Sequence, residues 1–70
     1  MSEWVYISKK TVENMCNWIN KYVTAQTILK CIIKHLQENN GYNDADLKKF
    51  VDSALYECGF DYDDLMEILE

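Results

Sequence analysis

The sequence lacks proline, has only two glycines, and contains no long uninterrupted apolar run among its 70 residues. A membrane-spanning helix needs about 20 consecutive apolar residues, and no stretch approaches that length. The N-terminus also lacks the basic start and the apolar stretch of a secretory signal peptide. We therefore expect a cytoplasmic protein with no membrane segment and no proline-containing linker.

Closely spaced cysteine pairs are also missing. The three cysteines, Cys16, Cys31 and Cys58, are an odd number at wide spacing, which argues against the disulfide framework of a small secreted protein. Structural zinc sites usually use Cys-x₂₋₄-Cys pairs, and none is present. Cys31 and His35 would share a helix face and complete a Cys₃His set, so a small metal-binding protein remains an alternative. We favour packing of all three cysteines in the core and predict no metal site and no cofactor.

Signs of a catalytic centre are scarce. His35 is the only histidine, and Cys31, one helical turn before it, could form a Cys–His pair with it. No motif indicates an oxyanion hole, and a short helical chain leaves little room for a substrate pocket of about 300 Å³ or more. A partly buried, hydrogen-bonded histidine is the simpler interpretation. We predict that the protein is not an enzyme and has no catalytic residues.

The short length limits the core that the chain can build. A domain of this size buries only about 60% of the surface that its unfolded chain exposes. Without further support, such a core rarely supplies more than about 3–5 kcal/mol of net stability. Because disulfides and a metal are not expected, dimerisation or tight packing against a partner is the predicted remedy. We expect one small domain that spans residues 1–70.

Apolar residues at helical spacing predict an all-α fold, a compact bundle of about four short helices with an extended N-terminal arm. The arm covers residues 1–7, where Trp4 to Ile7 are aromatic or β-branched and favour an extended backbone. Ser8 is a suitable N-cap for the first helix. The predicted helices span residues 9–22, 25–38, 44–58 and 62–69.

A short internal repeat marks the last two helix starts. Residues 41–47, GYNDADL, resemble residues 59–65, GFDYDDL. In each copy glycine ends the preceding helix, and Asn43 or Asp61 caps the next one. An aromatic residue just before the cap can pack on the leucine in the second turn, and acidic residues suit the positive end of the helix dipole. The repeat therefore predicts helix starts directly after Asn43 and Asp61.

Charge is divided unevenly between the two halves. Residues 1–35 hold five lysines and two acidic residues, a balance of +3, and residues 36–70 hold two lysines and ten acidic residues, a balance of −8. One interpretation is a solvated surface that keeps a small protein soluble. The other is an acidic patch that meets a basic partner surface and, where that surface binds nucleic acid, competes with phosphates. Direct nucleic-acid binding is not expected, because the acidic C-terminal helix has no lysine or arginine.

These observations favour a non-enzymatic protein-interaction module, a small acidic regulator or inhibitor of the kind that phages and mobile elements encode. Acidic side chains would supply charge, and exposed tyrosine and tryptophan would supply anchors, because these residues are enriched at binding hot spots. The alternatives are a structural subunit or obligate homodimer, and the metal-binding protein above. The predicted partner-binding residues are Trp4, Trp18, Asp52, Tyr56, Glu57, Asp63, Asp64, Glu67 and Glu70.

Overall fold

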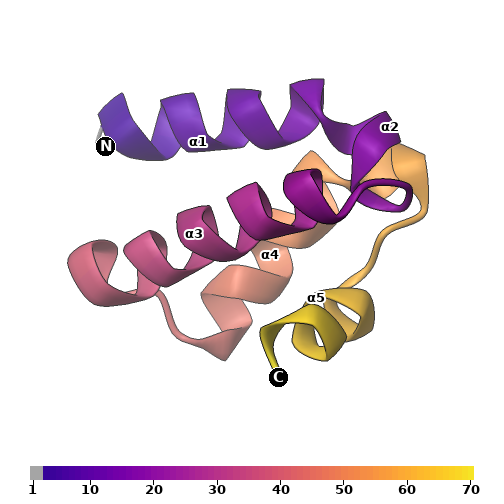
Figure 1. Ribbon diagram of the computed structural model, residues 1–70. Coiled ribbons are helices and arrows are strands. Elements are labelled where there is room, and N and C mark those ends of the chain that lie inside the picture. Colours follow the sequence, from indigo (N-terminus) through magenta and orange to yellow (C-terminus); the bar gives the residue numbers. More distant parts are fainter. Residues whose placement is uncertain (1–2) are drawn as a thin grey trace.

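The computed structural model describes residues 3–70, and these contain α-helices and one 3₁₀ turn but no strand. The predicted all-α class is therefore confirmed. Figure 1 shows the helices in chain order. The elements are α1 (Glu3–Asn14), α2 (Cys16–Ile19), α3 (Val23–Asn40), α4 (Asp44–Ala54), the 3₁₀ turn η1 (Tyr56–Cys58) and α5 (Tyr62–Leu69).

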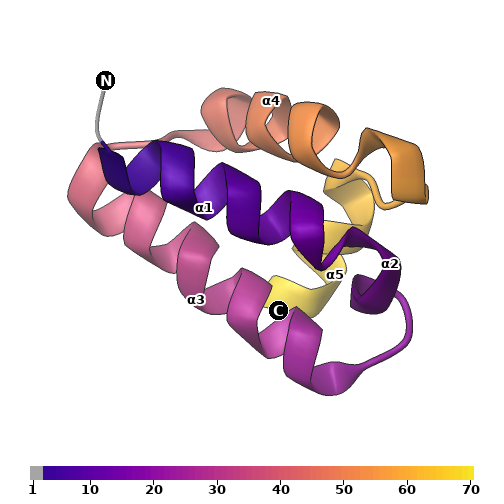
Figure 2. The same cartoon turned by 90° about the horizontal axis from the view of Figure 1, so that it is seen from above.

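Helices α1 and α5 cover the other two long helices from opposite sides. Both α1 and α5 contact α3 and α4, and the two views place α1 above them and α5 below (Figures 1 and 2). The short α2 turns the chain so that α3 runs back along α1 (Figure 1). The apolar core side chains with no exposed surface come from every part of the bundle: Val12, Ile19, Leu29, Ile33, Leu36, Leu47, Val51, Leu55 and Leu65.

The predicted extended arm over residues 1–7 differs from the structure. Its first two residues lie outside the described part of the chain, and the backbone is helical from the third residue onward. Trp4 and Val5 are half-buried against the core, and Ser8 and Val12 are fully buried one and two turns later. The preference of aromatic and β-branched residues for strands is weak, so packing of this helical face on the bundle overrides it. Ser8 therefore lies inside α1 and does not cap it.

The predicted helix over residues 9–22 is divided in two. The chain leaves helical geometry at Met15, which has φ −100° and ψ 11° and is buried. One turn of α2 follows, and α3 begins at Val23, two residues before its predicted start. The side chain of Gln26 donates a hydrogen bond to the Ile19 carbonyl oxygen at 3.0 Å. This bond ties the end of α2 to the first turn of α3.

Both N-caps that the internal repeat predicts are confirmed. Asn43 Oδ1 accepts a hydrogen bond from the Asp46 amide at 2.9 Å, and Asp46 Oδ2 accepts one from the Asn43 amide at 3.2 Å. Asp61 and Asp64 repeat the same exchange at 3.0 and 3.1 Å. Each pair is a capping box, which satisfies two backbone donors at the helix start. Helices α4 and α5 therefore begin where the repeat predicts.

The end of α4 differs from the prediction, which continued this helix to residue 58. The α-helix stops at Ala54, and Leu55 takes φ −120° and ψ 10° before η1. Gly59 then closes the turn with φ +74°, and Gly41 ends α3 in the same way with φ +66°. A left-handed conformation at these positions favours glycine. Gly41 ends α3 as predicted, whereas Gly59 ends η1 and not α4.

No helix within residues 3–70 is long and apolar enough to cross a membrane.

Candidate functional site

The most exposed aromatic side chain belongs to η1. Tyr56 is 80% exposed, and its neighbour Glu57 is also exposed. Both line a groove of about 510 Å³ between the end of α1, α2 and the end of α4, together with Glu13, Asn17 and Ser53. We call this hollow the η1 groove. Two carboxylates and no cationic side chain line it. Glu13 pairs with Lys10 at 3.6 Å, so Glu57 supplies the free negative charge, and the groove favours a positively charged occupant.

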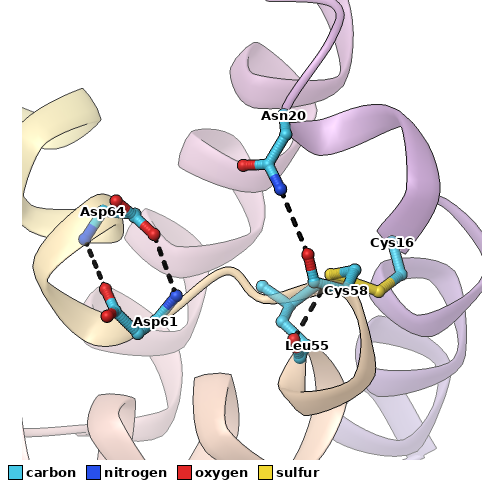
Figure 3. The surroundings of a disulfide bond; sticks show 6 residues. All are labelled: Cys16, Asn20, Leu55, Cys58, Asp61 and Asp64. Atoms are coloured by element: carbon cyan, nitrogen blue, oxygen red, sulfur yellow. Dashed lines mark hydrogen bonds between the residues drawn. A yellow bond between two sulfur atoms is a disulfide. The ribbon is translucent and has the colours of Figure 1, made fainter.

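Cys16 lines the η1 groove and forms a disulfide with Cys58. Figure 3 shows this bond. The two Cα atoms are 5.7 Å apart, inside the usual disulfide range of about 4.4–6.8 Å. The Asn20 side chain donates a hydrogen bond to the Cys58 carbonyl oxygen at 3.2 Å. The bridge and this hydrogen bond connect α2 and its following turn to η1, from segments far apart in the sequence.

The expectation that all three cysteines are free core residues is wrong. Cys16 and Cys58 are half-buried and bonded to each other, and Cys31 is an exposed free thiol. A separation of 42 residues carries no signal for pairing, because pairing depends on how α2 and η1 approach in space. The only hint in the sequence is that both cysteines lie beside apolar stripes, and that position also suits a free core cysteine.

The acidic residues of α5 do not all have the same role. Asp63, Glu67 and Glu70 are exposed, whereas Asp64 is half-buried and uses its carboxylate in the capping box with Asp61. The carboxylate of Asp64 therefore stabilises the start of α5, which accounts for an acidic residue at this position. The other three acids follow one another at a spacing of three to four residues and lie on one side of α5.

Asp52 of α4 and Asp63 of α5 come together across the two helices. They line the same shallow hollow of about 180 Å³, which Lys48, Asp61 and Tyr62 also line. Desolvation raises the pKa of the Tyr62 phenol above its ordinary value, and the carboxylates of Asp44 and Asp63 add to the rise. We call Asp52, Asp63, Glu67 and Glu70 the α4–α5 acidic surface.

Few of these charges are neutralised inside the chain. Among residues 3–70 the one ion pair joins Lys10 to Glu13 at 3.6 Å, within α1. The carboxylates of the α4–α5 acidic surface thus have no lysine within ion-pair distance in the described chain. They are available to a partner.

The two tryptophans lie in different places, and neither touches the η1 groove. Trp18 is 57% exposed and borders a groove of about 610 Å³ between α1, α2 and α3. Trp4 is half-buried and packs edge-on against His35, with ring centroids 4.3 Å apart. The predicted partner-binding residues therefore fall into separate regions. Tyr22 and Ile28 line the groove beside Trp18 but are not among the predicted binding residues, because their apolar spacing indicates only a place in the core.

The Cys–His set that the sequence suggested does not assemble. Cys16 and Cys58 bond to each other, and His35 is exposed, with its Nδ1 atom 3.2 Å from the Asn39 side-chain nitrogen. Within residues 3–70 no three His, Cys, Asp or Glu side chains gather in a way that could hold a metal ion. With the disulfide intact, only Cys31 and His35 of the original set are free.

No protein-family model matches the sequence, and comparisons with curated proteins and with solved structures found no significant match. Surface geometry and charge are therefore the features that indicate a function for this protein.

Proposed function

We propose that this protein is a non-enzymatic interaction module that binds a basic surface of a partner protein through the η1 groove. The observation that carries the proposal is Tyr56, 80% exposed beside Glu57 in a groove lined by carboxylates and no cation. An exposed tyrosine offers a large contact area with a hydrogen-bonding end, which suits a binding hot spot. A lysine or arginine of the partner can enter the groove next to that ring.

The α4–α5 acidic surface adds attraction at longer range. Residues 36–70 carry a formal balance of −8, and such a field steers a basic partner and raises the association rate. Salt screens it over about 8 Å at physiological ionic strength. If the basic partner surface normally binds nucleic acid, this protein would compete with phosphates for it. We therefore propose a small acidic regulator or inhibitor, as its size and charge suggest for a phage or mobile-element protein.

The cytoplasm is the location we propose, and the disulfide makes that proposal testable. Cytoplasmic thiols are usually kept reduced, whereas structural disulfides persist in oxidising compartments. In the cytoplasm we therefore expect the Cys16–Cys58 bridge to form only transiently, so that the pair alternates between its two redox states.

Affinity capture from the native host with matched variants tests the interaction. We expect the wild-type protein to retain a basic partner, and Tyr56→Ala and Glu57→Lys each to weaken its binding by at least about tenfold, as for a hot-spot residue. Lys30→Ala, an exposed change on α3, serves as the control. Equal affinity of all four proteins for the captured partner would contradict a role of the η1 groove.

A homodimer is the second candidate, and the groove beside Trp18 favours it. Its lining includes Met15, Tyr22, Ala25 and Ile28 and contains no charged side chain. A second copy that met this neutral surface would keep the acidic halves of the two chains apart. The core is already buried within one chain, so such a dimer would not be needed to complete it.

Light scattering on the eluting protein, over a hundredfold range of concentration, tests the dimer. We expect mass to rise toward two chains at high concentration and Ile28→Asp to keep the protein monomeric, because it places a charge in the apolar contact. A single-chain mass at every concentration would exclude this candidate.

A further inference from the structure

We propose that the Cys16–Cys58 disulfide is a redox clasp that holds the η1 groove in its binding shape, so that a dithiol reductant releases Tyr56 and Glu57. The inference rests on the proposed function of that groove, and it adds regulation of the same site. Tyr56, Glu57 and Cys58 are the three residues of η1, so the residues that would meet the partner directly precede the bridged cysteine.

The hydrogen bonds of η1 hold it only weakly. It is a three-residue 3₁₀ turn, and no side chain caps its start. Its backbone bonds, from the Cys58 amide to the Leu55 carbonyl and from the Gly59 amide to the Tyr56 carbonyl, measure 3.3 and 3.4 Å. Both exceed the usual range of about 2.7–3.2 Å, and 3₁₀ geometry is poor in any case. Another contact must therefore position the turn.

The disulfide supplies that contact. Leu55 before the turn and Phe60 after it are buried in the core. Of the residues between them, only Cys58 is half-buried against the core, and it alone is covalently tied to another element. The Asn20 side chain adds a hydrogen bond to the Cys58 carbonyl oxygen at an exposed position (Figure 3). Breaking the bridge would leave this hydrogen bond, the partial packing of Cys58 and the two flanking core residues to hold the turn, with no contact that fixes Tyr56 and Glu57.

The bridge is open to a reductant. Cys16 lines the η1 groove and also a neighbouring hollow of about 370 Å³, which Cys58 lines as well. The Cys58 sulfur lies 3.3 Å from the Leu55 carbonyl oxygen. A bonded sulfur has no hydrogen to donate there, but the reduced thiol would find this acceptor already in place.

The chemistry is thiol–disulfide exchange with a dithiol. One thiolate of the reductant attacks the Cys16 sulfur, the S–S bond breaks, and Cys58 leaves as a thiolate that takes up a proton. The second thiolate of the reductant then attacks the reductant's other sulfur, which is bonded to Cys16 in the mixed disulfide. A cyclic disulfide of the reductant forms, and the Cys16 thiolate leaves and is protonated in turn. Two electrons pass from the reductant to the protein, and the two protons that the dithiol loses balance those that the cysteines gain.

Backbone ¹⁵N relaxation of the full chain tests the clasp, with dithiothreitol as the reductant and Cys31→Ser as the background that prevents exchange through the free thiol. In the oxidised protein we expect order parameters of about 0.85 at Tyr56 and Glu57, falling below about 0.6 on reduction, as in a flexible segment. The value at Leu47 in α4 should stay unchanged. Unchanged values at all three residues would overturn the proposal. So would loss of all helical signal, because the bridge would then hold the whole fold and not η1.

A second measurement does not depend on how the reduced chain behaves. The rate of dithiothreitol reduction in the folded protein should not change between zero and low urea, because attack occurs through the open hollows. A rate that rises with urea in step with global unfolding would mean that the bridge is closed to reductants in the native state, and would also overturn the clasp.

Binding of an octalysine peptide links the clasp to the site. We expect the oxidised protein to bind it at least about tenfold more tightly than the reduced protein or Cys58→Ser. Equal binding in both redox states would overturn the control of the site. A peptide that bound neither state would contradict the proposed function, while the relaxation data would still decide whether the bridge holds η1.

Discussion

Asn43 and Asp61 start α4 and α5 with the same hydrogen-bond exchange, so each cap can be tested separately. Removing a capping oxygen usually costs about 1 kcal/mol. We expect Asn43→Ala and Asp61→Ala each to lower the free energy of unfolding by about that amount in urea titrations followed by circular dichroism. Asp61→Asn keeps an acceptor oxygen and should lose much less. Equal losses for the two changes at Asp61 would argue against the cap.

Tyr62 should make the protein sensitive to alkaline pH. Because its pKa is raised in the folded state, the unfolded chain loses the phenol proton first. Stability from this group is therefore complete below the ordinary tyrosine pKa of about 10 and declines as pH rises through the folded value. We expect Tyr62→Phe to reduce the fall in melting temperature between about pH 9 and 11. Tyr56→Phe, at an exposed position, is the control, and an equal effect of both changes would contradict this account.

The two caps could be predicted from the sequence because they depend on local hydrogen bonds. The pairing of the cysteines could not be predicted. A cap involves residues three apart, so the residue types and their spacing are sufficient. Cys16 and Cys58 meet only because α2 and η1 pack together. The candidate site was predicted only in part. Tyr56 and Glu57 are exposed, as a binding role requires, but Trp4 is half-buried against His35.

At the scale of elements, α5 depends on docking. It has eight residues, fewer than an isolated helix needs to form in water. Leu65 is its one fully buried side chain. We expect Leu65→Ala to lower the free energy of unfolding by about 2–5 kcal/mol, and to increase hydrogen exchange in α5 more than in α3. Met66→Ala, at an exposed position of the same helix, should have little effect.

If α5 in the Leu65→Ala variant stayed as protected from hydrogen exchange as in the wild type, its stability would come from the capping box and not from docking.

Helix α1 also depends on its packing against the other helices. Its first turn contains residues that favour strands, yet Trp4 and Val5 pack on the core and the turn is helical. Periodicity located the helical stripes correctly, but packing decided where they begin and break.

At the scale of the whole molecule, the disulfide supplies the stabilisation that a short chain lacks. For a bridge between residues 42 apart, the chain-entropy estimate is about 4 kcal/mol. This is similar to the roughly 3–5 kcal/mol that an unsupported core of this size provides. We expect the double variant Cys16→Ser with Cys58→Ser to melt about 15–30 °C below the wild type.

Cys31→Ser is the matched control and should melt within a few degrees of the wild type, because the Cys31 side chain is exposed. Melting curves of the wild type with and without dithiothreitol should reproduce the difference. A double variant as stable as the wild type would show that core packing alone stabilises the fold. In that case the ordering of η1 would be the only consequence of the bridge.

The sequence by itself determined the all-α class, the two capped helix starts, the glycine at the end of α3 and the division of charge between the halves. Each of these depends on residue types or on neighbours within one or two turns. Tertiary structure decided the rest: the helical first turn of α1, the break between α4 and η1, the separation of the two tryptophans, and the Cys16–Cys58 bridge. These features depend on contacts between segments far apart in the chain, whose energies no local pattern contains.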